Sequence, residues 1–302
     1  MLDRDIAIFI ASRGRAAILA RLVDDLLSAY VPALAAGGLS AAVVVYAQGY
    51  GADTLDTLRT AHARAIAGGT LHIIVADKPH RCIGEVIHAG LTAMNRRLTY
   101  RLAMLMDDDS TFTPHATVEQ NLRSAAKTFI EGRFRAFSIR LGPSTDLVYG
   151  PFIDPDGPIA PFKEKMIWAS RAVVDEALAL PRFDELAIAE DTVITALAWR
   201  GNPAACRTVQ GIGTFVHFGV EGGQDGGEAG GYAELVGFSG PPTAEAPHGK
   251  YDAALRSGVT HWHILPEVFV GPDHPHFIYA GIRGDLARAL GSGYPADAAD
   301  KI

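Results

Sequence analysis

The chain has 302 residues, of which 48% are hydrophobic, so it can bury a sizeable core. Its formal net charge of -7 argues against a nucleic-acid binder, because such proteins attract phosphate with basic surfaces. Two cysteines, Cys82 and Cys206, have no metal-type spacing and predict a reducing compartment. The charged N-terminus leads into too few apolar residues for a signal peptide or a membrane span, so we expect a soluble cytoplasmic protein.

Apolar runs alternate with amphipathic segments from the N-terminus onward. Short uncharged runs are typical of buried parallel strands, and apolar residues at helical spacing are typical of helices packed on a sheet. The pattern predicts strands over 6–11, 42–47, 71–76 and 102–106 and helices over 18–27, 54–66 and 84–98. The first helix is expected to end at Pro32 and Gly37-Gly38. This alternation predicts an α/β fold with a mainly parallel sheet and right-handed crossovers.

The pattern becomes less regular in the rest of the chain. Another amphipathic helix is predicted to about Ile130, followed by short strands and Pro/Gly-rich turns to 161 and by helices over 173–180 and 192–199. The sequence contains no internal repeat and no convincing domain boundary. We therefore expect one domain.

The apolar run 102–106 leads directly into Asp107, Asp108 and Asp109. Ligands of open sheets collect at the carboxyl ends of parallel strands, where this triplet is expected to lie. Clustered carboxylates repel each other strongly, so the arrangement favours a hard divalent cation with phosphate ligands. Mg²⁺ or Mn²⁺ is expected rather than zinc, since no Cys/His set surrounds the triplet. The alternative is a solvated acidic turn that caps the next helix.

The order of these features resembles the GT-A fold of nucleotide-sugar-dependent glycosyltransferases, above all their large inverting family. The resemblance rests on the turn with Arg13 and Arg15 after the first strand, and on the aspartate triplet after the fourth. It implies a GT-A-like, Rossmann-like sheet flanked by helices. Residues 1–115 would form a nucleotide-binding half and residues 116–302 an acceptor-side half of a single domain.

The resemblance also implies an activity: a sugar moves from a nucleoside diphosphate sugar to an acceptor hydroxyl. Its DxD element would fall on Asp107 and Asp109, which with His217 would hold Mn²⁺ or Mg²⁺ as a Lewis acid for the leaving diphosphate. The other residues expected to contact the donor are Arg13 and Arg81 at the phosphates, Gln48 or Asp77 at the base, and Asp107 and Asp108 near the nucleotide. For either arginine and for His217, an ordinary structural or surface role is the alternative.

Glu190 and Asp191 match the acidic pair that carries the catalytic base in this family. The preceding segments 166–171 and 183–185 resemble its acceptor side. Asp191 stands at the start of a predicted helix, whose positive end favours an ionised carboxylate that can accept a proton. The resemblance therefore implies an inverting reaction with Asp191 as base and Glu190 beside it. Ordinary capping of the helix is the alternative.

Several positions depart from the family pattern. Ala11 stands where a proline is common, and Ala47-Gln48 replaces an acidic residue that often contacts the base. The base, the sugar, the hydroxyl acceptor and the oligomeric state therefore stay open. Retaining GT-A enzymes also combine DxD with a late histidine, so retention stays an alternative to inversion.

The glycine-rich segment 219–240 follows His217 directly and is expected to form a lid over the donor, with a plain linker as the alternative. Four further histidines lack the acidic or cysteine partners of a zinc site and are interpreted as structural or acceptor-side residues: His261, His263, His274 and His276.

Three other classes compete with the transferase. Asp107, Asp109 and Thr111 match the DxDxT pattern of haloacid-dehalogenase-like phosphatases, with Asp107 as nucleophile, although three predicted strands precede it. A sugar-nucleotide pyrophosphorylase requires a glycine-rich loop after the first strand, and residues 12–15 of this chain do not provide one. The third competing class is a non-enzymatic binding module in which the aspartate triplet holds a structural ion.

Overall fold

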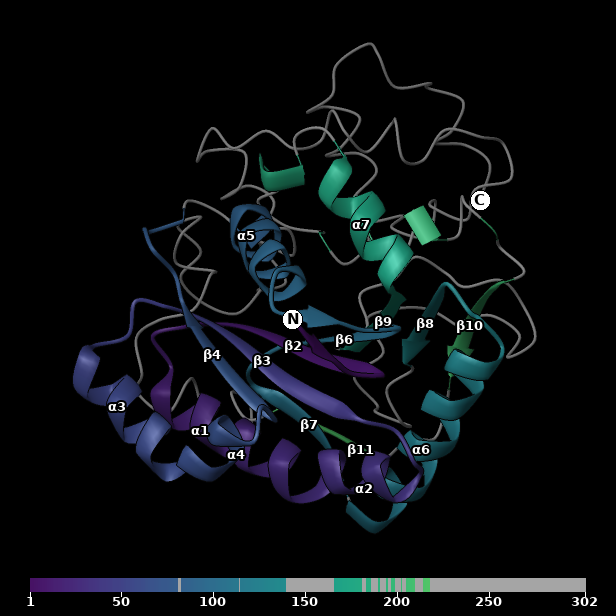
Figure 1. Cartoon of the computed structure of the whole chain (residues 1–302), viewed down its shortest axis with the longest axis horizontal. Coiled ribbons are helices and arrows are strands. Elements are labelled where there is room, and N and C mark those ends of the chain that lie inside the picture. Colours follow the sequence, from purple (N-terminus) through teal and green to yellow (C-terminus); the bar gives the residue numbers. More distant parts are fainter. Residues whose placement is uncertain are drawn as a thin grey trace, which may run out of the picture.

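The computed structural model describes most of the first 139 residues and shorter segments beyond them (Figure 1). The described residues are 1–80, 83–113, 115–139, 166–180, 183–185, 190, 194, 197–198, 202, 205–209 and 214–217.

A seven-stranded sheet forms the centre of the described chain (Figure 1). Its strands are β2 (Ile6–Arg13), β3 (Ala41–Gln48), β4 (Leu71–Val75), β6 (Leu102–Met106), β8 (Ala136–Ile139), β9 (Met166–Ser170) and β10 (Cys206–Val209). Their order is β10-β8-β9-β6-β2-β3-β4, and only β9 runs antiparallel to its neighbours. The predicted α/β class with a mainly parallel sheet is confirmed.

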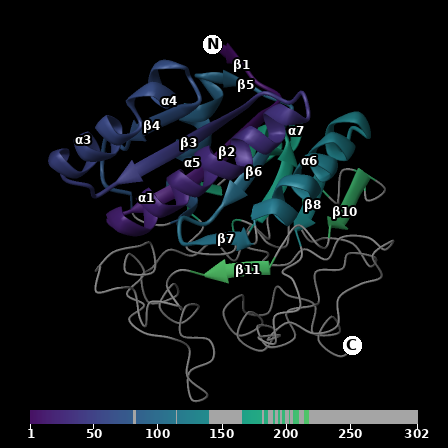
Figure 2. The ribbon, with the colours of Figure 1, turned by 90° about the horizontal axis from the view of Figure 1, so that it is seen from below.

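Helices cover both faces of this sheet, as Figures 1 and 2 show. Along β2, Ile6, Ile8 and Ile10 belong to the core on one face, and Ala7 and Phe9 to the core on the other, as the two-residue period of a strand requires. The first face is covered by α1 (Ala16–Asp25), α2 (Val31–Ala36), α3 (Ala52–Ala61), α4 (Ala63–Ala67) and α6 (His115–Glu131), and the second by α5 (Ile83–Asn95) and α7 (Arg171–Ala179).

The first helical region is longer than one α-helix. After α1 the chain forms a π-helical segment over Leu26–Tyr30 and then α2, so the backbone stays helical through Pro32. Pro32 lies in the first turn of α2, where a missing N–H costs little. The prediction that Pro32 helps to end the helix is therefore wrong, whereas the helical region does end at the predicted glycine pair, where Gly38 has a φ of 77°. The π-helical segment ends at Tyr30, whose buried hydroxyl lies 3.0 Å from Thr111 Oγ1.

Two short strand pairs complete the described fold. β1 (Leu2–Asp3) pairs with β5 (Leu98–Thr99), so α5 ends earlier than the sequence predicts. β7 (Ser110–Thr113) pairs antiparallel with β11 (Thr214–His217). The predicted helix over 54–66 is divided at His62 into α3 and α4. Among the described helices, none is both long and apolar enough to cross a membrane.

Gly90 lets α5 pack tightly against the sheet, and an added methyl group there should destabilise the fold. A Cβ on Gly90 would lie 2.6 Å from Phe9 Cζ and 3.0 Å from Tyr46 Cγ. We expect Gly90→Ala to lower the free energy of unfolding by about 1–3 kcal/mol, the usual cost of overpacking, in spite of alanine's higher helix propensity. Denaturant titration measures the change.

Phe9→Leu in the same chain provides the matched test, since it removes the ring atoms that the new methyl group meets. In a chain that already carries Phe9→Leu, the change Gly90→Ala should lower the free energy of unfolding by less than it does in the wild type. A Gly90→Ala variant more stable than the wild type would contradict the close packing of α5 on Phe9.

Candidate active site

The parallel strands β2, β3 and β6 end at one edge of the sheet, where the predicted site residues gather. Arg13 is the last residue of β2 and lies opposite Gln48, the last residue of β3. β6 pairs with β2 up to Ile10 and Met106, and the aspartate triplet follows at once. The topology therefore places these groups at the carboxyl ends of neighbouring strands, where open sheets bind ligands.

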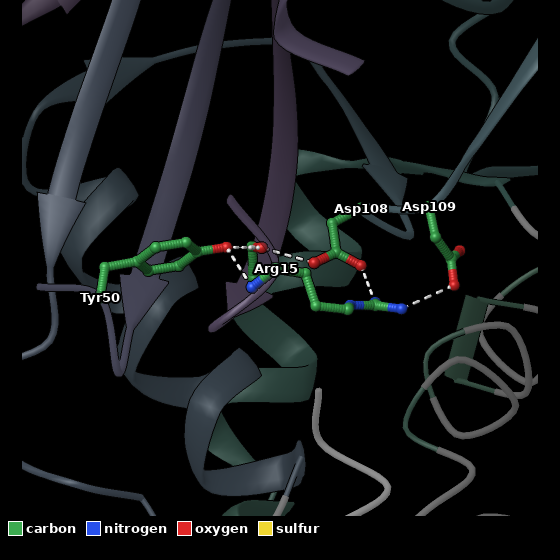
Figure 3. A network of polar contacts seen from close by, with 5 residues as sticks. Arg15, Tyr50, Asp108 and Asp109 are labelled. Carbon is green, nitrogen blue, oxygen red and sulfur yellow. Dashed lines mark hydrogen bonds and ion pairs between the residues drawn. The ribbon is translucent and has the colours of Figure 1, made fainter. Parts of the chain in front are cut away.

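The three aspartates differ in their surroundings. Asp107 is exposed, whereas Asp108 is only 2% and Asp109 only 8% exposed. Arg15 donates through Nη1 to Asp109 Oδ2 at 3.0 Å and through Nη2 to Asp108 Oδ1 (Figure 3). A buried carboxylate needs a positive or hydrogen-bonding partner, and one guanidinium supplies it to both.

A second set of hydrogen bonds joins the end of β2 to Asp108. Ser12 donates through its hydroxyl to Asp108 Oδ2 and also contacts the Tyr50 hydroxyl. The Arg15 backbone N–H donates to the same Tyr50 hydroxyl at 3.2 Å (Figure 3). Gly14 has a φ of 67°, which glycine adopts readily, and this turn directs Arg15 toward the aspartates. Residues 12–15 and Asp108 are thus tied together.

Burial dominates the electrostatics of this network. It raises the pKa of Asp108 to about 7, although Arg15 acts in the opposite direction. Burial alone would lower the pKa of Arg15, but Asp108 and Asp109 raise it above its ordinary value. Burial also raises the pKa of Tyr50 to about 12. Arg15 therefore stays charged, and Tyr50 acts as a neutral hydroxyl.

The raised pKa of Asp108 predicts a specific pH dependence of stability. Because its pKa rises from 3.8 to about 7 on folding, its contribution is fully present below about pH 4 and is lost as the pH rises through about 7. The thermal midpoint of the wild type should therefore fall relative to that of Asp108→Asn as the pH is raised from 4 to 8. Differential scanning fluorimetry measures both midpoints.

Asp5→Asn is the matched control for this experiment. Burial works against ionisation of Asp5, but hydrogen bonds from Ser40 and Arg101 lower its pKa below 3.8. The contribution of Asp5 is therefore already complete near pH 5, and the difference between wild type and Asp5→Asn should stay constant from pH 5 to 8. A constant difference for Asp108→Asn as well would show that Asp108 is ionised throughout.

The strand β7 continues directly from Asp109 and carries the pairing with β11. In this antiparallel pair His217 lies opposite Ser110, and Thr214 lies opposite Thr113. The backbone of His217 is therefore beside the residue that follows Asp109. The pairing places the predicted metal ligand His217 at the aspartate end of the site, while its side chain lies outside what the structure describes.

Gln48 belongs to a second buried polar group at the end of β3. Its Oε1 accepts a hydrogen bond from the His80 backbone N–H at 3.3 Å, and His80 Nε2 lies 2.8 Å from the Tyr46 hydroxyl. Gln48 is 6% exposed, and the other candidate for the base, Asp77, is exposed. The carbonyl of Gln48 is therefore engaged within the protein, which constrains how its amide could meet a base.

The structure brings Asp108 and Asp109 together with Arg15, which was not among the predicted site residues. Arg13, a predicted site residue, is half-buried at the end of β2. Glu190 is helical and half-buried. The other predicted residues and segments lie outside the described residues: Arg81, Asp191, the 219–240 loop, His261, His263, His274 and His276.

Three residues of the network were missed, for different reasons. Ser12 is the second-last residue of β2 and Arg15 directly precedes α1, so their place at the end of a buried strand was a usable signal. Tyr50 carries no signal in the sequence, since its role depends on where β3 ends beside β2.

Asp107, Asp108 and Asp109 provide three neighbouring carboxyl groups directly after β6. Their carboxylates are the hard oxygen ligands that Mg²⁺ and Mn²⁺ prefer. Within the described segments, no group of three or more His, Cys, Asp or Glu side chains is arranged to hold a metal ion. A complete set would need further donors, such as His217 or phosphate oxygens.

Neither protein-family models nor curated proteins gave a match to the chain. Comparison with solved structures did find similar proteins. The chain is similar to the crystal structure of S. aureus TarS 1–349, with a TM-score of 0.50 and 14% identity over 95% of this chain and 81% of that one. Its complex with UDP gives a TM-score of 0.51 and 12% identity over the same shares. The fold is GT-A-like. At these identities the likeness concerns the fold, and residue roles must be argued from the site.

Proposed function

We propose that this protein is a metal-dependent glycosyltransferase that moves a sugar from a nucleoside diphosphate sugar to an acceptor hydroxyl. One observation carries the proposal: buried Asp108 and Asp109 follow β6 and lie beside Arg15, and the backbone of His217 in β11 pairs with Ser110, the residue after Asp109. The GT-A-like fold and the UDP complex of the similar TarS structure support the choice of donor.

The residues at this edge would divide the work as follows. Asp109, with Asp107 and His217, would hold Mn²⁺ or Mg²⁺, which would supply charge stabilisation to the leaving diphosphate. Arg13 and Arg15 would bind phosphate oxygens, a task suited to guanidinium groups. Asp108, held by Ser12 and Arg15, would fix the turn that carries these arginines. Gln48 or Asp77 would contact the base.

Asp191 would accept the proton of the acceptor hydroxyl, with Glu190 beside it, in an inverting reaction. A retaining GT-A enzyme is the second candidate, because it uses the same donor site. The anomeric configuration of the product, read by NMR, decides between them.

Binding of nucleoside diphosphates tests the proposal. Calorimetric titration of UDP and other nucleoside diphosphates, with and without Mn²⁺, should give saturable binding that requires the metal. EDTA should remove it. A folded protein that binds no nucleoside diphosphate in the presence of either Mn²⁺ or Mg²⁺ would contradict a nucleotide-sugar transferase.

A further inference from the structure

Arg15 occupies the place of a cation in the site. Its guanidinium binds both buried carboxylates, one nitrogen to each, and its own side chain is 17% exposed. The positive charge of the guanidinium therefore stands between the two carboxyl groups. The protein's own cation therefore already neutralises much of the charge that would attract a divalent ion.

The contacts of Arg15 are not complete. Within the described part of the chain, its buried Nε has no hydrogen-bond partner. A buried donor without an acceptor is unfavourable, and an anion that reaches it gains a charge-assisted hydrogen bond. The backbone of Arg15 is held at the Tyr50 hydroxyl, so the side chain can change partners while the turn stays in place.

We propose that Arg15 exchanges anionic partners: without donor it holds Asp108 and Asp109, and a bound diphosphate takes over its guanidinium and releases Asp109 for a divalent cation. This inference rests on the proposed function and adds to it how the binding of the metal depends on the binding of the diphosphate. A divalent cation alone would meet the positive charge of Arg15 at close range. With a diphosphate present, the Arg15 guanidinium and the divalent cation each have an anionic partner. The metal and the diphosphate therefore bind as a unit.

Binding of Mn²⁺ alone is the first test, because it needs no knowledge of the base. Free Mn²⁺ is measured by electron paramagnetic resonance in titrations of wild type and Arg15→Gln without nucleotide. We expect the variant to bind Mn²⁺ more tightly by about 5- to 150-fold, the usual range of coupling between two sites. Equal affinities, or tight Mn²⁺ binding by the wild type, would overturn the proposal.

Arg101→Gln is the matched control. Arg101 pairs with Asp5 next to the opposite ends of the same two strands, β2 and β6. Its loss also breaks an Arg–Asp pair, but one outside the site. Mn²⁺ affinity in this variant should equal that of the wild type, and an increase as large as in Arg15→Gln would point to a general charge effect and overturn the proposal.

A second measurement uses the wild type, in case Arg15→Gln does not fold. The Nε–H signal of Arg15 is followed by ¹H–¹⁵N NMR. UDP or inorganic pyrophosphate together with Mg²⁺ should shift it, and Mg²⁺ alone should not. A shift with Mg²⁺ alone, or none with Mg²⁺ and UDP together at saturation, would contradict an exchange of partners.

The two proposals fail differently. A wild type that binds neither UDP nor pyrophosphate in the presence of Mn²⁺ overturns both. Metal-dependent UDP binding combined with equal Mn²⁺ affinities in wild type and Arg15→Gln overturns the role of Arg15 alone.

Discussion

Replacing Asp109 by asparagine is expected to abolish metal-dependent binding of a nucleoside diphosphate. The change removes one of two buried charges at the end of β6, while Arg15 keeps its contact with Asp108. Loss of an outer-sphere partner typically costs a metal site about 10- to 100-fold, so loss of a charged ligand should cost at least about 100-fold. Calorimetric titration with UDP and Mn²⁺ measures the effect.

Asp5→Asn serves as the control for this variant. Asp5 is likewise paired with an arginine, at the other ends of β2 and β6, and its replacement should leave UDP binding unchanged. Circular dichroism of both variants checks that the fold is retained. If Asp109→Asn binds UDP and Mn²⁺ with wild-type affinity, Asp109 is not a metal ligand.

Replacing Asp191 by asparagine is expected to slow sugar transfer by about 10²- to 10⁴-fold, the usual contribution of a positioned general base. The amide keeps the size of the side chain but cannot accept the proton of the acceptor hydroxyl. Donor binding should be unchanged, because the predicted donor contacts lie on other segments. Initial rates and UDP affinity, measured on the same preparation, separate the two effects.

The alternative role of Asp191 as a helix cap gives the opposite pattern. Loss of a cap lowers the thermal midpoint and leaves the rate per folded molecule nearly unchanged. Glu190→Gln, at the neighbouring position, shows how much either property depends on the acidic pair as a whole. A product with retained configuration would exclude Asp191 as the base of a single displacement whatever its rate.

The parallel part of the sheet was predictable because its signal is local. β2, β3, β4 and β6 are short apolar runs bounded by turns, and each is followed by a helical pattern or by the aspartate triplet. β9 could not be placed in the same way. Its five residues show that it is apolar, but not that it inserts antiparallel between β6 and β8.

The site was predictable only as far as the aspartates. Arg13 and Arg15 are two positions apart, and the choice between them depends on the positive φ of Gly14, which the residue type permits but does not require. The difference between exposed Asp107 and buried Asp108 depends on what packs beside the turn. No local pattern encodes it.

The pairing of β7 with β11 affects the order in which the site can form. Residues up to 113 contain β2, β3, β4, β6 and β7, whereas β11 is made only when synthesis reaches 214–217. Contacts between segments this far apart form late, because a long loop must first be closed. A nascent chain therefore presents Asp108 and Asp109 before the strand beside them exists. During that interval Arg15, made earlier still, can neutralise the two carboxylates and allow the strand ends to pack.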